Sequence, residues 1–190
     1  MPIHPVRAQE NVQLPNEVLS IIINELGSDR ENNHSTQAAL ASCRLASHDL
    51  WSLTTPLLFS SMELGGVNNI RQARNLIQLL SIDDIAASVH TFTLCCGLLG
   101  KLETATLIPK ILSRLPHIQN FTLESDKYHS FHFSSVHLST IQAQTLCKSP
   151  NLTTLNLGRI SSFPITFILA CPNLRCLRLS DVILHVNSIC

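Results

Sequence analysis

The segment Leu14-Pro15-Asn16-Glu17-Val18-Leu19 opens a series of short apolar helices in the first part of the chain. Pro15 suits the first turn of a helix, where its missing N–H group removes no hydrogen bond, and the Glu17 carboxylate is favourable near the positive end of the helix dipole. The apolar residues that follow share one broad helical face: Val18, Leu19, Ile22, Ile23 and Leu26.

Two further helices are predicted after this first one. Gly27 predicts a left-handed end for the first helix, and the polar segment 28–35 predicts a loop. Thr36 is expected to cap the second helix, and a third should begin near His48 with its apolar residues before Pro56. Because so small a unit cannot bury every apolar face of three short helices, part of this surface should be covered by something else.

This module resembles the F-box of fungal-type F-box proteins. That family's pattern begins L-P-x-E with two aliphatic residues and ends L-x-x-C-x-L-V-S-x-x-W-x-x-L-x-x-P-L-L-F. The resemblance implies docking of the apolar helices on a Skp-type adaptor, and through it on the cullin scaffold of a ubiquitin ligase. The residues implied to bind the adaptor are Leu14, Pro15, Glu17, Ile22, Leu26, Leu40, Cys43, Leu45, Leu50, Trp51, Leu53, Pro56, Leu58 and Phe59.

The chain departs from the F-box pattern in three places. Leu50 occupies the usual Trp position and Trp51 follows it, His48-Asp49 replaces a basic pair, and the inter-helix segment 27–35 is long. Periodicity alone leaves a second interpretation open, in which these are three core helices of a larger fold.

A six-residue motif, called the phrase below, recurs in the second part of the chain. Its first and fourth residues are apolar, and its sixth residue is always Leu. The last two apolar positions are two residues apart, so they point to the same face of a strand. Helix-like segments lie between the copies, at 107–115, 141–147 and 165–171. The copies are 89–94, 118–123, 152–157 and 174–179, and the last three are preceded by Pro116, Pro150 and Pro172.

This alternation resembles a leucine-rich-repeat solenoid, and an ordinary α/β domain with parallel strands is the alternative. The family's Asn or Cys position holds Gly97, Asp126, Ile160 and Val182, which predicts an irregular array without an Asn ladder. The final copy is followed by no polar cap, so its core should be exposed. The residues predicted to bind a target protein lie between the strand leucines: Thr93, Thr122, Asn156 and Arg178.

Composition narrows the class of function. The formal net charge is zero and only 14% of residues are charged, which favours neither nucleic acid nor a membrane surface as a partner. Seven cysteines without CxxC spacing, and a start that lacks a signal-like apolar run, favour a reducing compartment. We therefore expect a cytoplasmic or nuclear protein.

Motifs for chemistry are weak in this sequence. Cys95-Cys96 favours no redox site, and His129, His132 and His137 have zinc-like spacing but no cysteine pair or carboxylate with matching spacing beside them. The chain contains no phosphate-binding Gly-rich loop, no GxSxG and no HExxH. We expect no enzyme activity, no cofactor and no metal.

The predicted fold class is α + α/β, a short helical F-box module followed by an irregular leucine-rich-repeat solenoid. The predicted divisions are a flexible N-terminus (1–11), the F-box-like module (12–64), a connecting helix (65–88) and the repeats (89–190). The implied function is substrate recruitment to a Skp/cullin/F-box ubiquitin ligase. The alternative is a leucine-rich-repeat interaction scaffold with a degenerate F-box and no ligase role.

Overall fold

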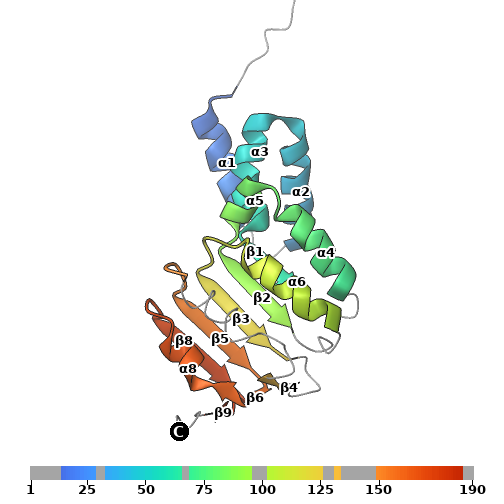
Figure 1. Cartoon of the computed structure of the whole chain (residues 1–190). Coiled ribbons are helices and arrows are strands. Elements are labelled where there is room, and N and C mark those ends of the chain that lie inside the picture. The colour runs from blue at the N-terminus through green and yellow to red at the C-terminus, as the bar shows by residue number, and fades with distance from the viewer. Residues whose placement is uncertain are drawn as a thin grey trace, which may run out of the picture. The chain divides into compact units, whose positions relative to one another are not determined.

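The computed structural model describes residues 14–28, 33–65, 69–95, 102–125, 131–133 and 149–185. The chain divides into two compact units, Met1–Leu57 and Leu58–Cys190 (Figure 1). From the F-box pattern and the Gly65-Gly66 break, the sequence predicts a module that ends at residue 64. The earlier division follows from strand β1 (Ser61–Leu64), which pairs with the sheet of the second unit.

The first unit is helical and consists of α1 (Asn16–Ser28), α2 (Asn33–Ala46) and α3 (His48–Phe59), the last of which crosses the boundary. The Pro15 carbonyl accepts hydrogen bonds from the N–H groups of Val18 and Leu19, so Pro15 directly precedes the first turn of α1. The Ser47 hydroxyl accepts a hydrogen bond of 3.2 Å from the Leu50 N–H group. Ser47 therefore caps α3 at the point where the helix was expected to begin.

Gly27 does not end α1 in a left-handed conformation, which corrects the sequence expectation. It lies inside the helix, which continues to Ser28. A Cβ atom at Gly27 would lie 3.0 Å from Cδ1 of Leu57, which is tighter than ordinary van der Waals contact. The absence of a side chain at Gly27 leaves room for the Leu57 side chain of α3.

The second and third helices also differ from expectation at their ends. Because α2 begins at Asn33, Thr36 lies within its first turn and is buried, and it is not the cap. Of the expected loop 28–35, residue 28 and residues 33–35 therefore lie in helices. Helix α3 continues through Pro56 to Phe59, so the proline lies in its last turn, where its missing N–H group removes one i→i−4 hydrogen bond. The buried hydroxyls of Thr54 and Thr55 donate to the carbonyls of Leu50 and Trp51, which satisfies them within the helix.

The second unit is built on a parallel sheet of five strands whose spatial order follows the chain. Its central strands are β2 (Thr91–Cys95), β3 (Asn120–Glu124) and β5 (Thr154–Gly158), and β1 and β8 (Cys176–Ser180) form its edges. All four ladders are parallel and keep the phrase in register. The residues aligned across the sheet at the last position of the phrase are Leu64, Leu94, Leu123, Leu157 and Leu179.

The turn before each strand repeats one hydrogen-bond pattern. The Ser60 carbonyl accepts from the N–H groups of both His90 and Thr91, at 3.0 and 2.9 Å. The carbonyls of His90, Gln119 and Thr153 each accept from two N–H groups in the following turn in the same way. Each turn is therefore fixed to the one before it by main-chain bonds that do not depend on side-chain identity.

Asparagine side chains also link successive turns, from a position that the sequence did not predict. Asn151 donates from Nδ2 to the Pro116 carbonyl at 3.2 Å, and Asn173 donates to the Pro150 carbonyl at 2.8 Å. The family's usual position indeed holds Ile160 and Val182. The asparagine bonds therefore come from the proline-asparagine turns and not from the family's Asn position.

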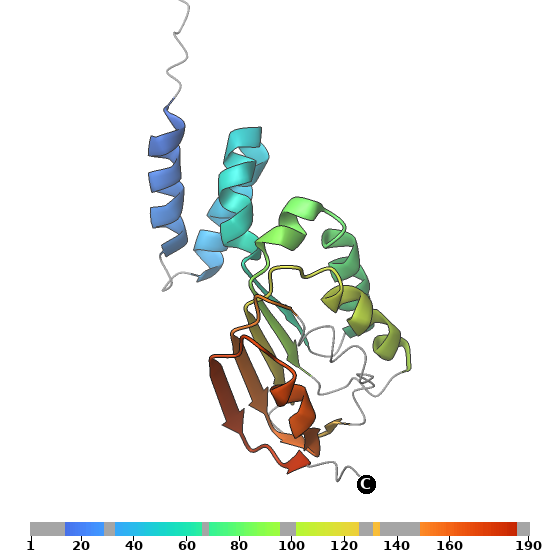
Figure 2. The same ribbon diagram turned by 60° about the vertical axis from the view of Figure 1, so that its left-hand side comes forward.

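Helices α4 (Asn69–Leu79), α6 (Leu102–Leu112) and α8 (Ile165–Leu169) lie on one face of the sheet, and α5 (Asp83–Ser88) precedes β2 (Figure 2). Ala73 and Leu76 on α4, and Leu80 directly after it, are buried at helical spacing and pack in one core with the inward-facing strand residues. The expected connecting segment 65–88 therefore belongs to this unit as two helices. The helix expected at 141–147 lies outside the described residues.

Two short parallel pairs extend the last turns. Strand β4 (Phe131–His132) pairs with β6 (Ile160–Ser161), and β7 (Phe163–Pro164) pairs with β9 (Leu184–His185). Phe163 lies between Phe133 and Phe167, with ring centroids 4.8 and 5.1 Å away and edge-to-face geometry. These rings fill the core beneath β6 and β7.

Within the described part of the chain, every helix is too short or too polar to cross a membrane.

Candidate protein-binding surfaces

Helix α1 presents an outer aliphatic stripe, which consists of Leu14, Val18, Ile21 and Ile22. Leu14 lies two residues before the helix, and the spacing of Val18, Ile21 and Ile22 places them on neighbouring positions of one helical face. Between 39% and 63% of each side chain is exposed. The inward side of the helix is formed by Ile23, which is buried, and by the half-buried Leu19 and Leu26. The single apolar face read from the sequence is thus two adjacent faces, of which one is left uncovered within this unit.

The residues predicted to bind an adaptor fall into three groups by exposure. Leu40 is buried, so it supports the packing of the first unit and does not reach its surface. Half-buried positions are Leu26, Cys43, Leu50, Trp51, Leu53, Leu58 and Phe59. Exposed positions are Leu14, Pro15, Glu17, Ile22, Leu45 and Pro56.

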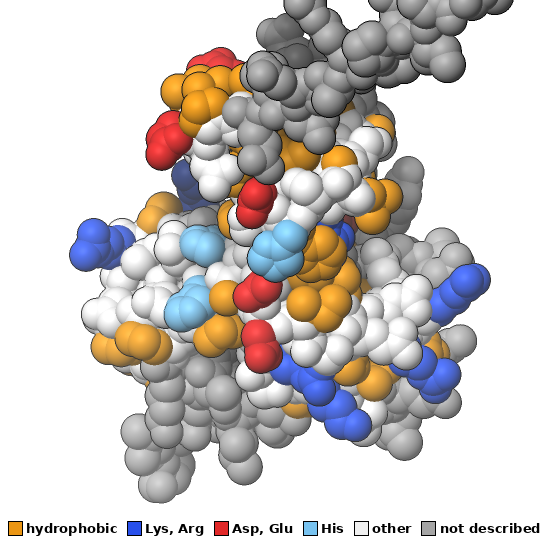
Figure 3. All heavy atoms as spheres, turned by 90° about the horizontal axis from the view of Figure 1, so that it is seen from above, with side chains coloured by type: hydrophobic (Ala, Val, Ile, Leu, Met, Phe, Trp, Pro, Cys, Tyr) orange, Lys and Arg blue, Asp and Glu red, His pale blue; other side chains and the backbone are white. Residues whose placement is uncertain are grey.

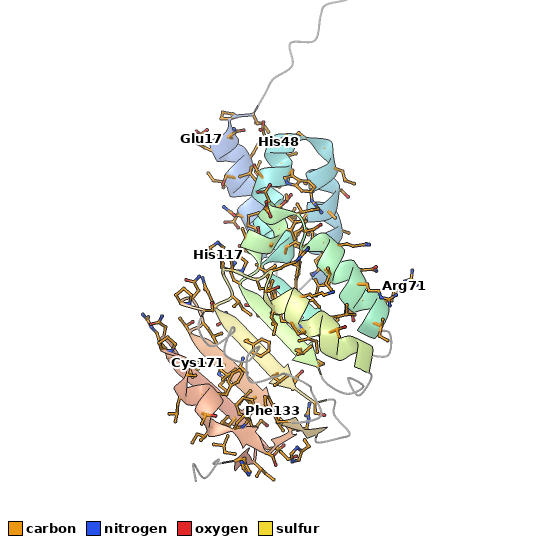
Figure 4. The ribbon with its side chains drawn as sticks, in the orientation of Figure 1. Glu17, His48, Arg71, His117, Phe133 and Cys171 are labelled. Atoms are coloured by element: carbon orange, nitrogen blue, oxygen red, sulfur yellow. The ribbon has the colours of Figure 1, made fainter. Side chains whose placement is uncertain are left out.

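Sequence reasoning missed the role of Val18 and Ile21 in this exposed surface. Ile21 is the most exposed aliphatic residue of the stripe, at 63%, and Leu45 near the end of α2 is exposed to 86%. An acidic residue lies on the same helix as the stripe, since Glu17 on α1 is exposed (Figure 4). The face of the molecule seen from above shows hydrophobic side chains at its surface beside acidic ones (Figure 3).

Trp51 is held by Arg44 across α2 and α3. The guanidinium carbon of Arg44 lies 3.5 Å from the centre of the Trp51 ring, which is cation–π geometry. Burial lowers the pKa of the Arg44 guanidinium. Trp51 is half-buried, so its ring both joins two helices and leaves part of its surface available for contact.

The open face of the sheet carries a second candidate surface, the polar row, defined as Glu63, Thr93, Thr122, Asn156 and Arg178. Pairing in the four ladders places these residues side by side on successive strands. All four residues predicted to bind a target are therefore brought together, and Glu63 extends them at one edge. Asn156 Nδ2 donates to Thr122 Oγ1 at 3.0 Å, which fixes the centre of the row.

Beside the polar row lies a thiol between two carboxylates. The Cys95 thiol lies 3.4 Å from Oε1 of Glu124 and 3.5 Å from Oε1 of Glu63. Burial and the hydrogen bond to Glu124 are the main causes that raise the pKa of Cys95 from 9.0 to about 12. The thiol is therefore protonated at neutral pH and is a poor nucleophile.

Two glycines flank this group. A Cβ atom at Gly65 would lie 2.8 Å from Cβ of Cys95, and one at Gly158 would lie 3.2 Å from Cβ of Glu124. Both glycines leave room for the side chains of the neighbouring strand. Cys95 and Glu124 therefore lie side by side on neighbouring strands, with a glycine on each side of the pair.

The groups with possible metal or redox chemistry are only partly described. Cys96, His129 and His137 lie outside the described residues, as do Gly97 and Asp126. His132 is exposed on β4. Among the residues that the structure describes, no three His, Cys, Asp or Glu side chains are grouped so that they could hold a metal ion.

Comparisons with protein-family models, with curated proteins and with solved structures find no match to this chain. The family resemblance seen in the sequence motifs therefore stays a prediction. What the structure adds to it is the position and exposure of each motif residue.

Proposed function

We propose that this protein recruits substrates to a Skp/cullin/F-box ubiquitin ligase, with the first unit as an F-box that binds the adaptor. The observation that carries the proposal is the outer aliphatic stripe of α1. It begins at Leu14, the first residue of the Leu14-Pro15-x-Glu17 motif, and continues through Ile22. Aliphatic side chains that are uncovered within their own unit are suited to a hydrophobic partner surface.

The second unit is proposed to be an irregular leucine-rich-repeat array that holds the target protein. Its parallel strands follow one another in chain order, and each phrase places its last Leu at the same register position. The polar row lies on the open face and carries opposite charges at its two ends, from Glu63 to Arg178. Such a surface can recognise a polar protein segment with a defined direction.

The proposed mechanism is that of a bivalent tether. One surface binds the adaptor and the other holds the target, so both belong to one complex. Target lysines are then kept near the charged ubiquitin carrier, which raises their effective concentration without any catalytic group in this chain.

The test is co-purification of residues 1–190 with a Skp-type adaptor, using an Ile21→Asp/Ile22→Asp variant. Both side chains are at least half exposed, so charges there should not unfold the chain, which circular dichroism would verify. We expect binding to weaken at least about tenfold, since carboxylates would be buried without a partner. The matched control is Leu169→Asp on α8, an exposed leucine outside the first unit.

Two results would contradict the ligase proposal. One is a folded protein that forms no complex with the adaptor. The other is a complex that tolerates both aspartates as well as it tolerates Leu169→Asp. Either result would favour the alternative, a repeat scaffold with a degenerate F-box, because the polar row does not depend on α1.

A further inference from the structure

The two edges of the parallel sheet differ in how well their inward-facing residues are covered. At the first edge, Leu64 of β1 is only 1% exposed. At the other edge, Leu177 and Leu179 of β8 are 40% and 45% exposed, although their partners on β5, Leu155 and Leu157, are buried. The first edge is therefore closed, and the second is open among the residues that the structure describes.

The open edge combines three features. Strand β8 is paired on one side only, so one side of its backbone has no strand partner within the described chain. Its two leucines point towards the core side but lack a neighbour beyond them. Between them Arg178 lies on the open face, as the last residue of the polar row, and is exposed.

A second copy of the chain fits this edge poorly. A head-to-tail copy would need the edge of β1, where Leu64 is already covered. In a two-fold antiparallel pair, the register that matches all five residues of β8 is centred on Arg178. That register sets the two Arg178 guanidinium groups directly opposite each other, and like charges in such a pair are unfavourable.

We propose that the β8 edge binds an extended segment of a protein partner with an acidic residue between two aliphatic residues. The partner strand would pair in parallel, continuing the register shared by the four existing ladders. Its aliphatic side chains would cover Leu177 and Leu179, and its carboxylate would face Arg178. Main-chain hydrogen bonds provide affinity in such strand addition, and the alternating side chains provide selectivity.

This proposal is independent of the adaptor proposal, because it uses neither the first unit nor a ubiquitin ligase. The chain itself contains a segment of the required type in β1, where Glu63 lies between Met62 and Leu64. A labelled synthetic peptide with the sequence of residues 59–65, Phe-Ser-Ser-Met-Glu-Leu-Gly, is therefore a suitable probe.

The experiment measures fluorescence polarisation of this peptide with the full chain. We expect binding to weaken at least about tenfold when Lys replaces Glu in the peptide, or when the protein carries Arg178→Glu. Combining both changes should restore most of the affinity. The control variant is Arg175→Glu, which reverses another exposed arginine just before β8.

Three outcomes would overturn the proposal. They are no binding at peptide concentrations up to about 1 mM, equal binding of the Glu and Lys peptides, and no recovery in the charge-swapped combination. Sedimentation of the protein alone adds a fourth test. A dimer that is lost in a Leu179→Asp variant would show that a second copy occupies the edge.

Discussion

The guanidinium carbon of Arg44 lies 3.5 Å from the centre of the Trp51 ring, so one charged side chain of α2 covers the aromatic side chain of α3. Trp51 follows the position at which the F-box pattern has its Trp. The contact gives this displaced ring a structural partner inside the first unit. The same pair supplies a spectroscopic probe, since Trp51 is the single tryptophan of the chain.

Replacing Arg44 should loosen the contact between α2 and α3. We expect Arg44→Ala to lower the free energy of unfolding by about 1–2 kcal/mol, through loss of cation–π attraction and of packing by the arginine stem. The measurement is chemical denaturation followed by Trp51 emission. Arg71→Ala on the exposed side of α4 is the control and should change stability by less than about 0.5 kcal/mol. Equal effects of the two variants would show that the ring contact contributes nothing.

Gly65→Ala should destabilise the second unit by about 1–3 kcal/mol, because the added Cβ atom would lie 2.8 Å from Cβ of Cys95. Neither Cβ atom can move by changing a side-chain rotamer. Gly158→Ala is the matched comparison and should cost less, since its contact with Glu124 is 3.2 Å. Thermal unfolding of both variants shows which of them loses more stability. A larger loss for Gly158→Ala than for Gly65→Ala would refute this prediction.

Cys95 should react slowly with iodoacetamide in the folded protein. Its pKa is raised from 9.0 to about 12, so very little thiolate is present at pH 8. Glu124→Gln should speed alkylation by removing a negative neighbour, whereas Glu17→Gln on α1 should not. The rates follow from mass spectrometry of the Cys95 peptide, compared with the same peptide in the urea-unfolded chain. Fast alkylation in the folded state at pH 8 would contradict the prediction.

The same pKa shift fixes the sign of a pH effect on stability. A thiol whose pKa is raised on folding holds its proton more tightly in the folded state than in the unfolded one. Its contribution is fully present below pH 9.0 and is lost as the pH rises towards about 12. Denaturation midpoints of the native protein should therefore fall above pH 9 more steeply than those of a Cys95→Ser variant.

Asn173→Ala should remove the link between two successive turns, because Asn173 Nδ2 donates to the Pro150 carbonyl at 2.8 Å. One such hydrogen bond contributes about 0.5–1.5 kcal/mol, and the bond is exposed, which favours the lower part of that range. Urea denaturation should show a shifted midpoint with an unchanged slope. Gln72→Ala, at an exposed position of α4, serves as the control. No loss of stability relative to that control would exclude a structural role for the Asn link.

Strand positions could be predicted from the sequence where the phrase did not overlap another motif. The copies ending at Leu94, Leu123, Leu157 and Leu179 all contribute a strand to the sheet. The copy at 59–64, with Met62 and Leu64 facing inward, was overlooked because its first residue, Phe59, also completes the F-box pattern. One residue ends a helix and begins a phrase, and a linear pattern assigned it to only one of them.

Contacts between distant residues explain the local errors. Gly27 reads as a helix stop, but its use depends on Leu57, which lies in another helix. Thr36 reads as a cap, yet α2 begins before it. Propensity describes what a residue permits locally, and the tertiary neighbour decides which of these options is used.

The candidate surfaces were predictable to different degrees. The polar row follows from alternation along a strand, and Thr122 and Asn156 lie side by side as that alternation requires. Exposure on α1 was not predictable in the same way. A helix with aliphatic residues over a wide arc gives no sign of which part is covered, and only the packing of Ile23 shows that Ile21 is outside.

Each strand of the five-stranded sheet is bonded only to the strands that come before and after it within that sheet. No closure condition fixes the number of strands, unlike in a barrel, where strand number, tilt and diameter are linked. Duplication or deletion of one strand together with the segment that leads to the next strand, such as the stretch from β3 to β5, leaves every remaining strand with neighbours of the same kind. The open face of the sheet can therefore grow or shrink by one strand at a time through gene duplication, and the side chains that each strand presents can differ.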